Sequence, residues 1–159
     1  MVSFERKLGD ENNLPDFLFD SSFFNKMEQI FSVGDYYYVV VNLISFEVEF
    51  VHNNVEKILG YPIEIFKQQM VMNEIHPDDA ASFLNYGKEV GRFFSHLPFE
   101  KIMKYKTRYD FRVKKSDGQY IRILHQGIPL QIDDKGGMIR KLIIHTDISH
   151  LKKDNKMSL

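Results

Sequence analysis

The stretch of sequence that decides the fold is YKTRYDFRVKKSDGQYIRILHQGIPLQIDDKGGMIRKLIIHTDISHLKK, residues 105–153. Apolar and polar side chains alternate along three runs within it, and a period of two is typical of strands with one buried face. The turn SDGQ joins the first two runs, and the turn DDKGG precedes the third. Asp-Gly and glycine-rich turns favour hairpins. The stretch therefore predicts three consecutive antiparallel strands, over residues 107–114, 121–130 and 138–147.

Two further strands are expected nearer the N-terminus. Residues 36–41, YYYVVV, are aromatic and β-branched, which is typical of a strand buried on both faces. In residues 46–52, Phe46, Val48 and Phe50 alternate with acidic residues, which predicts a strand with these three side chains on one face and the acidic ones on the other. The two runs predict a hairpin.

Helix signals fill the region between the second and third strands. Asn53 and Asn54 are expected to cap a helix over 55–59, which Gly60 ends, and a second short helix continues through Phe66. A long helix is expected from about residue 80 to about residue 96, because its apolar residues recur at helical spacing. Near the start of the chain, residues after Ser22 show the same spacing and predict an amphipathic helix that ends near residue 34.

Composition excludes several classes of function. The chain has 159 residues and a net charge of −1, so it lacks the basic surface that a nucleic-acid binder needs. It has no cysteine, which removes disulfides, thiolate metal sites and thiol nucleophiles. The longest uncharged apolar run, residues 36–46, is far shorter than the ~20 residues of a membrane helix, and the N-terminus lacks a secretory apolar region. We expect a cytoplasmic protein that does not bind a membrane.

The order of elements resembles the PAS domain of the fold-3 type. Four local motifs are also similar to that family: ILGYP (58–62), IHPDD (75–79), KSDG (115–118) followed by YIR, and TDIS (146–149). The resemblance covers about residues 36–151. It implies an α+β fold in which helices pack on one face of a five-stranded antiparallel sheet, with an additional helix before it. An unrelated α+β domain with coincidental turns is the alternative.

The resemblance implies an exit point at the end of the last strand. Asp147, Ile148 and Ser149 match the family's Asp-Ile-Thr motif, whose aspartate couples the sensor to the output, and Ser149 keeps the hydroxyl of the threonine. A plain cap of the next segment is the simpler interpretation. We expect three parts: an N-terminal extension over 1–34, a PAS domain over 35–151, and an exit tail over 152–159 that leads to an output domain beyond residue 159.

A cavity is expected between the sheet and the long helix, where PAS pockets lie. Its lining would come from Phe83, Tyr86 and Val90 of the helix and from Tyr109, Phe111 and Val113 of a strand; the same side chains could instead simply fill the core. An unidentified small ligand fits such a cavity. We expect no metal, haem or flavin, although His96 is the best positioned candidate for an axial haem ligand. His125 and His145 lie on consecutive strands and could approach each other, without a third metal ligand.

A homodimer is expected through the N-terminal helix, which carries more apolar surface than one helix face needs to cover a sheet edge. The residues of this interface would be Phe23, Phe24, Met27, Ile30 and Phe31. Folding of the same helix onto its own sheet is the alternative.

The expected function is that of a non-catalytic sensor and dimerisation domain in a bacterial signalling protein. No phosphate loop, Ser-His-Asp order or zinc-protease motif is present, so we expect no enzyme activity. The chain resembles the N-terminal PAS segments of LuxR-type transcription regulators, whose DNA-binding helix-turn-helix domain would come after this segment. The input domain of a sensor histidine kinase is one alternative, and a small stand-alone ligand-binding protein or hydrolase is another.

Overall fold

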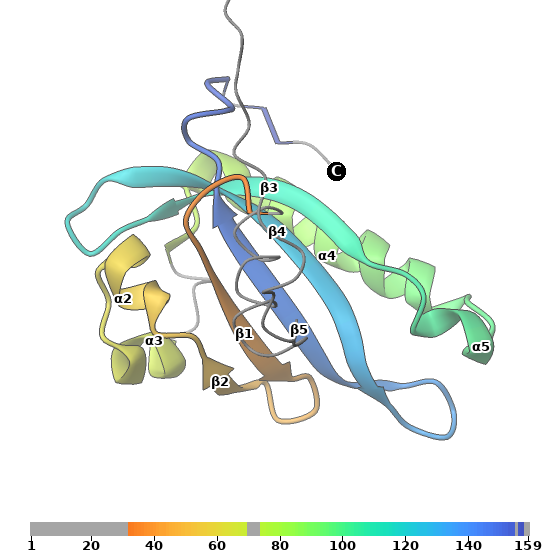
Figure 1. Cartoon of the computed structure of the whole chain (residues 1–159). Coiled ribbons are helices and arrows are strands. Elements are labelled where there is room, and N and C mark those ends of the chain that lie inside the picture. The colour runs from red at the N-terminus through yellow and green to blue at the C-terminus, as the bar shows by residue number, and fades with distance from the viewer. Residues whose placement is uncertain (1–31, 70–73, 155, 158–159) are drawn as a thin grey trace, which may run out of the picture. The chain divides into compact units, whose positions relative to one another are not determined.

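The five strands form one antiparallel sheet in the spatial order β2-β1-β5-β4-β3 (Figure 1). The computed structural model describes residues 32–69, 74–154 and 156–157. The strands are β1 (Tyr36–Asn42), β2 (Glu47–Val51), β3 (Thr107–Lys114), β4 (Tyr120–Ile132) and β5 (Met138–Asp147). The first and last strands of the chain, β1 and β5, are therefore neighbours at the centre of the sheet.

The C-terminal three strands agree with the sequence pattern. Both predicted turns are present: Gly118 and Gly136 adopt φ angles of 85° and 84°, which glycine takes without strain. The β5 strand has the predicted bounds, whereas β4 extends to Ile132, beyond Pro129. Pro129 is tolerated there because the pairing of β3 with β4 ends at Thr107 opposite Gly127, so the strand that would need its missing N–H has already ended.

The first hairpin corrects two predictions. In β1, side chains alternate between buried and half-buried, so the strand is not buried on both faces. A β-bulge between Val40 and Val41 shifts the register with β2 by one residue. Val48 and Val51 consequently face the core, whereas Phe50 is 47% exposed and stacks against Tyr38 on the other face.

The described residues between β2 and β3 form four helices: α2 (Asn54–Leu59), α3 (Ile63–Gln69), α4 (Pro77–Ser95) and α5 (Phe99–Ile102). Gly60 ends α2 in the left-handed conformation at φ 78°, as the sequence predicts. The predicted asparagine cap is wrong in detail, because Asn53 makes no side-chain capping bond and the Asn54 amide donates instead to the Tyr36 carbonyl.

The long helix α4 begins at Pro77, three residues earlier than predicted. The His76 ring caps it, with Nδ1 accepting a hydrogen bond from the Asp78 backbone N–H. His76 N–H also donates to the Arg112 carbonyl at the free edge of β3, and Ile75 forms a β-bridge to Val113. The start of α4 is therefore tied to the edge strand of the sheet.

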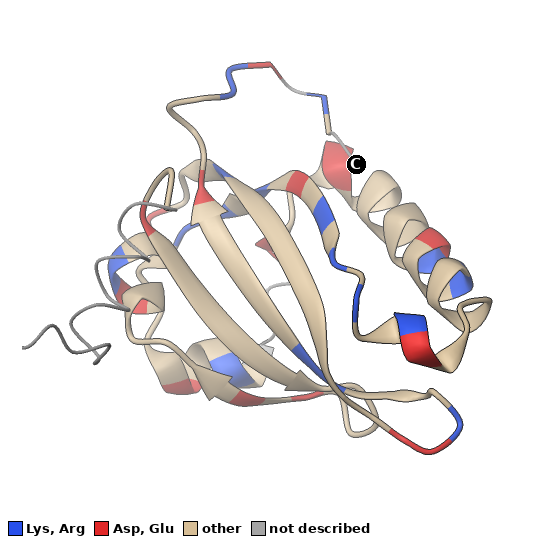
Figure 2. Cartoon of the chain, turned by 45° about the vertical axis from the view of Figure 1, so that its right-hand side comes forward, with Lys and Arg blue, Asp and Glu red and all other residues tan. Residues whose placement is uncertain are grey.

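The core lies on one face of the sheet, which we call the inner face. Its fully buried side chains include Tyr37, Phe111 and Ile123, and α2, α3 and α4 lie on this side (Figure 1). The predicted α+β arrangement is confirmed. The opposite, outer face carries few charges on its central strands (Figure 2) and none of the described helices covers it. Its apolar residues are Tyr38, Val40, Leu124, Ile128, Leu142 and Ile144.

The predicted N-terminal helix and its interface residues Phe23, Phe24, Met27, Ile30 and Phe31 lie outside the described residues. Ser32–Leu159 form a compact unit of their own. None of the helices within the described ranges is long and apolar enough to cross a membrane.

Candidate functional site

An apolar cavity of about 90 Å³ lies between the inner face of the sheet and the helices. A water molecule needs about 10–15 Å³ on such a scale, so the cavity has room for about six to nine groups of that size. Its walls come from β1, β2, α3, α4 and all three C-terminal strands. The lining residues are Val39, Val41, Val48, Phe66, Ile75, Phe83, Phe111, His125, Ile143 and His145.

Three buried polar side chains form a chain across the inner face of three adjacent strands. The hydroxyl of Tyr37 on β1 lies 2.8 Å from Nδ1 of His145 on β5. Nε2 of His145 lies 2.9 Å from Nδ1 of His125 on β4. The register places these residues side by side, because Tyr37 pairs with His145 and His145 pairs with His125. The expectation that the two histidines approach each other is confirmed.

The row of hydrogen-bonded side chains ends at an atom that has no hydrogen-bond partner. His125 Nε2 is buried and has no hydrogen-bond partner. The stacked ring of Tyr109, 4.4 Å from the His125 ring, holds the imidazole in its orientation. Buried polar atoms in folded proteins are almost always paired, and one that is not calls for an explanation such as a ligand or an ordered water.

Counting donors and acceptors decides in which direction the hydrogen bonds among Tyr37, His145 and His125 run. If the Tyr37 hydroxyl donates to His145 Nδ1, neutral His145 carries its proton on Nε2 and donates to His125 Nδ1. Neutral His125 then carries its proton on Nε2, and that N–H is the one group left unpaired. The reverse direction leaves both the Tyr37 hydroxyl hydrogen and His125 Nε2 unpaired, which costs more free energy. The arrangement therefore leaves an unpaired N–H donor on a ring that lines the cavity.

The protonation states agree with this direction. Burial raises the pKa of Tyr37 far above its ordinary value, so the phenol keeps its proton. Burial lowers the pKa of His145 to about 3 and, together with the charge of Lys141, keeps the ring neutral. The pKa of His125 is also well below its ordinary value, first through burial and then through His145 and Lys141. The three hydrogen-bonded side chains Tyr37, His145 and His125 are therefore all uncharged near neutral pH.

Of the six side chains predicted to line a cavity, Phe83 and Phe111 do so. Their rings meet edge to face, with centroids 4.9 Å apart. Tyr109 and Val113 are buried in the same core layer but do not line this cavity, and Tyr86 packs against the core. Val90 lies further along α4 and lines a different space, described below.

The haem candidate His96 does not lie near the cavity. It is exposed at the end of α4, where Nδ1 lies 2.7 Å from the Arg92 carbonyl. Within the described ranges, no three histidine or acidic side chains are close enough together to hold a metal ion. The sequence analysis did not include His125 and His145 among the cavity-lining residues. Their positions along β4 and β5 place them on the inner face, and this alternation could have identified them.

The exit motif is held by a compact set of hydrogen bonds. The Asp147 carboxylate accepts from the Ser149 backbone N–H at 2.9 Å and from its hydroxyl at 2.6 Å. The Ser149 hydroxyl oxygen in turn accepts from the Arg122 backbone N–H, and the Ile148 N–H donates to the Arg122 carbonyl. The capping bond is therefore made by Asp147, and Ser149 links the end of β5 to β4.

A second set of contacts, which the sequence did not predict, holds the segment after the exit motif. Arg122 and Asp110 form an ion pair on the outer face, with side chains only 4% and 6% exposed. Lys152 Nζ lies 2.8 Å from the Asp110 carboxylate, and Arg122 Nη2 donates to the Asp154 carbonyl at 3.0 Å. We call residues 150–157 the exit segment. These contacts tie the described residues of the exit segment to β3 and β4.

Another ion pair joins α4 to the edge strand. The Arg112 guanidinium donates to both carboxylate oxygens of Asp79, at 3.0 and 2.7 Å, and the Arg112 backbone N–H adds a third bond at 2.8 Å. Burial raises the pKa of Asp79, but the hydrogen bonds and charge of Arg112 outweigh that effect, and the pKa ends below its ordinary value. The sequence indicated only that Asp79 favours a helix start.

Solved structures of known proteins have a similar architecture. No family model and no curated protein matches the chain. Three similar solved structures are the N-terminal domain of a diguanylate cyclase with a PAS/PAC sensor from Marinobacter aquaeolei, a PAS domain from Colwellia psychrerythraea, and a sensory box histidine kinase/response regulator from Burkholderia thailandensis.

The likeness extends over most of the domain. The Marinobacter structure has a TM-score of 0.58 at 19% identity, covering 73% of this chain and 97% of its own. The Colwellia structure has a TM-score of 0.55 at 20% identity, covering 80% and 98%. The Burkholderia structure has a TM-score of 0.56 at 18% identity, covering 80% and 85%. The chain therefore has the PAS fold, as the sequence motifs indicated.

Proposed function

We propose that this chain is the non-catalytic sensory input domain of a signalling protein. One observation carries the proposal: the two histidines at the cavity and the hydrogen bonds of the exit motif share strands β4 and β5. His145 is two residues before Asp147 on β5, and His125 is three residues after Arg122 on β4. A ligand that shifts the cavity histidines therefore acts on these strands two or three residues away from the exit contacts.

The mechanism is a shift between two populations. A ligand stabilises whichever arrangement of β4 and β5 it binds more tightly, and the change reaches an output domain only if that arrangement alters the exit segment. The buried pair of Arg122 and Asp110 supplies the second element, since the segment is either docked on these charges or released from them. Docking and release are the two states that the proposal requires.

The cavity defines the ligand by its chemistry. The ligand is small, with about six to nine non-hydrogen atoms, and mostly apolar, because the walls are largely aliphatic and aromatic. It brings one hydrogen-bond acceptor, such as a carbonyl or ether oxygen, to the N–H of His125.

A LuxR-type transcription regulator is the output that we propose, on the strength of the resemblance of the N-terminal region and of the ending at residues 145–153. A sensor histidine kinase is the second candidate, favoured by the fold likeness to a sensory box histidine kinase/response regulator. The coding sequence downstream of residue 159 distinguishes them, since one predicts a helix-turn-helix domain and the other a helix with a phosphoacceptor histidine.

Cyclopentanone is a suitable probe of the sensor mechanism, because it has six non-hydrogen atoms and a single acceptor. We expect it to shift the ¹⁵N resonance of His125 Nε2 and to change amide hydrogen exchange over residues 147–157. Cyclopentane is the matched control without an acceptor and should leave His125 Nε2 unpaired. Binding of cyclopentanone without any change in exchange over residues 147–157 would refute the coupling, and the absence of binding would refute the ligand class.

A further inference from the structure

A second and larger space lies between the C-terminal half of α4 and the sheet. We call it the α4 chamber; its volume is about 380 Å³, within the range of about 300–1,000 Å³ typical of small-molecule pockets. Its lining shares no residue with the histidine cavity. The lining residues are Leu43, Gly87, Val90, Gly91, Phe94, Ser95, Ile102, Gly136, Gly137, Met138 and Lys141.

The chamber is open because α4 presents glycine to it. Gly87 and Gly91 lie one turn apart, and a Cβ atom added at either would meet nothing within 4 Å. Each glycine in a helix interior costs about 1 kcal/mol relative to alanine. Local packing does not demand these two glycines, so the helix keeps an open face at a cost in stability. The apolar neighbours Val90 and Phe94 are only half-buried there.

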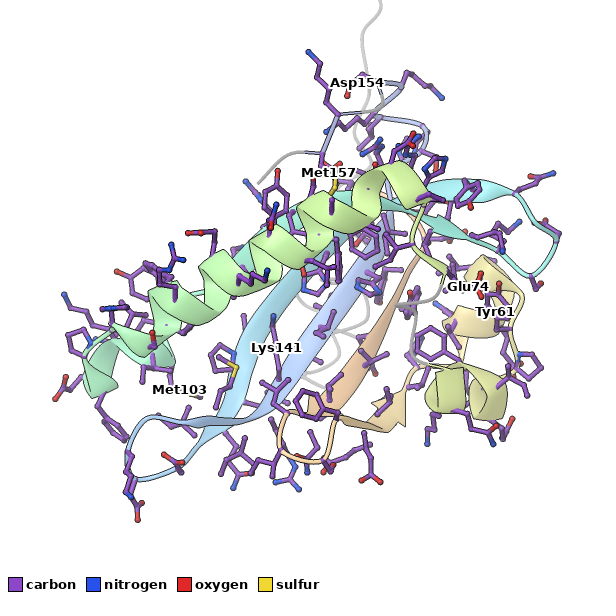
Figure 3. All side chains as sticks on the ribbon, turned by 180° about the vertical axis from the view of Figure 1, so that it is seen from behind. Tyr61, Glu74, Met103, Lys141, Asp154 and Met157 are labelled. Carbon is purple, nitrogen blue, oxygen red and sulfur yellow. The ribbon has the colours of Figure 1, made fainter. Side chains whose placement is uncertain are left out.

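One cation stands in this apolar space. Lys141 lies on the inner face of β5, and Figure 3 shows its side chain between the sheet and α4. The stem crosses β4 at Gly127, where an added Cβ atom would lie 2.3 Å from Lys141 Cε and 2.8 Å from Nζ. The glycine therefore leaves room for the lysine to lie against β4, and the same side chain lines the chamber.

The ammonium has no anionic partner within the described part of the chain. No aspartate or glutamate is among the residues that line the chamber. In the β4–β5 turn, the Asp133 carboxylate accepts hydrogen bonds from the backbone N–H groups of Lys135 and Gly137. Burial lowers the pKa of Lys141 to about 8, which reflects a charge without compensation.

We propose that the α4 chamber binds a small amphiphilic carboxylate, with its carboxylate on Lys141 and its hydrocarbon part between α4 and the sheet. The charge requirement comes from the unpaired ammonium, and the hydrocarbon part comes from the half-buried side chains of Leu43, Val90, Phe94 and Met138. The far end is closed by Ile102 of α5, whose Cδ1 would lie 2.7 Å from a Cβ atom at Gly136. This inference goes beyond the sensor proposal and does not depend on the histidine cavity.

Octanoate tests the proposal, with 1-octanol as the neutral analogue of equal chain length. We expect isothermal titration calorimetry of the full chain to show octanoate binding at millimolar concentration. Lys141→Met removes the charge and keeps the length of the side chain; it should weaken octanoate at least tenfold, corresponding to about 1.4 kcal/mol, and change octanol binding by less than about twofold. Lys141→Arg should retain octanoate.

Gly91→Leu is the second variant, because it fills the chamber without touching Lys141. It should abolish binding of both ligands while the ¹⁵N spectrum of the His125 and His145 rings stays unchanged, which shows that the fold is intact. Equal octanoate affinity in wild type and Lys141→Met would overturn the carboxylate assignment. Failure of octanoate to bind wild type, or undiminished binding to Gly91→Leu, would overturn the chamber as its site.

Discussion

Arg122 and Asp110 are paired on the outer face of the sheet, and the exit segment covers them. Their side chains are 4% and 6% exposed, so water barely reaches either charge. Lys152 adds a second cation to the same carboxylate, at 2.8 Å. Ion pairs on an open surface contribute little, whereas removing one partner of a buried pair leaves a charge without compensation. The docking of residues 150–157 therefore depends on a complete set of charges.

Replacing Arg122 with methionine should lower the free energy of unfolding by about 3–5 kcal/mol, because the Asp110 carboxylate stays buried with only Lys152 beside it. Chemical denaturation at neutral pH measures this change. The double variant Asp110→Leu with Arg122→Met removes both charges and should recover most of the loss. A double variant no more stable than the single one would show that packing, and not the charge pair, holds the segment.

Asp79 and Arg112 provide a prediction for the other edge of the sheet. Asp79→Asn keeps the shape of the side chain but removes the charge from three hydrogen bonds, and should cost about 1–3 kcal/mol. Since the pKa of Asp79 is lowered in the folded protein, its contribution is present above pH ~4 and is lost as the pH falls through its folded pKa. The stability gap between wild type and Asp79→Asn should therefore narrow in acid.

The histidine pair predicts a loss of stability below neutral pH. Both rings are neutral in the folded protein and their pKa values are lowered, that of His145 to about 3. Below pH ~6.5 the unfolded chain binds protons that the folded chain does not, so stability falls by up to about 1.4 kcal/mol per pH unit for each ring. His125→Leu should remove the contribution of one ring to the pH dependence of the free energy of unfolding. Urea denaturation between pH 5 and 7 measures this change.

His96→Gln is the matched control for this slope, because His96 is exposed at the end of α4. It should leave the slope unchanged. An unaltered slope in His125→Leu would contradict the buried neutral state of that ring.

The homodimer predicted from the sequence stays a prediction, since its interface residues lie outside the described part of the chain. Within the described unit, the outer face of β1, β5 and β4 is apolar, and an apolar face of this kind often marks an association site. Sedimentation of the full chain at tens of micromolar should give a dimer, and a variant without residues 1–32 should give a monomer. A monomeric full chain, or a dimeric variant, would rule out this interface.

Local signals in the sequence predicted much of the fold. Turn residues set the two C-terminal hairpins, and Gly60 ends α2, because the backbone geometry at those positions depends on the residue itself. The meeting of His125 and His145 also came from their places on consecutive strands. The face of the sheet was predicted wrongly for Phe50. A bulge between β1 and β2 moves the side chains beyond it to the opposite face, and no residue type in β2 signals a bulge.

The site was less predictable because its key contacts join distant parts of the chain. Asp79 and Arg112 are 33 residues apart, and Arg122 reaches Asp154 across 32. Their partners depend on how the edge strand and the exit segment lie, which periodicity does not encode. The α4 chamber depends on the distance between a helix and a sheet, which residue types do not encode; a Cβ atom added at Gly87 or Gly91 would meet nothing within 4 Å.

The closeness of Gly34 to Asp147 has a mechanical consequence. A Cβ atom at Gly34 would lie 2.2 Å from the Asp147 carbonyl oxygen, and the Asp147 N–H donates to the Asp35 carbonyl, so the chain enters β1 and leaves β5 at one point. Because β1 and β5 are antiparallel neighbours, tension that pulls these two ends apart loads their hydrogen bonds one after another, as in opening a zipper. The domain should yield at low force when stretched between residues 34 and 148, and its central strand pair should be the first to separate.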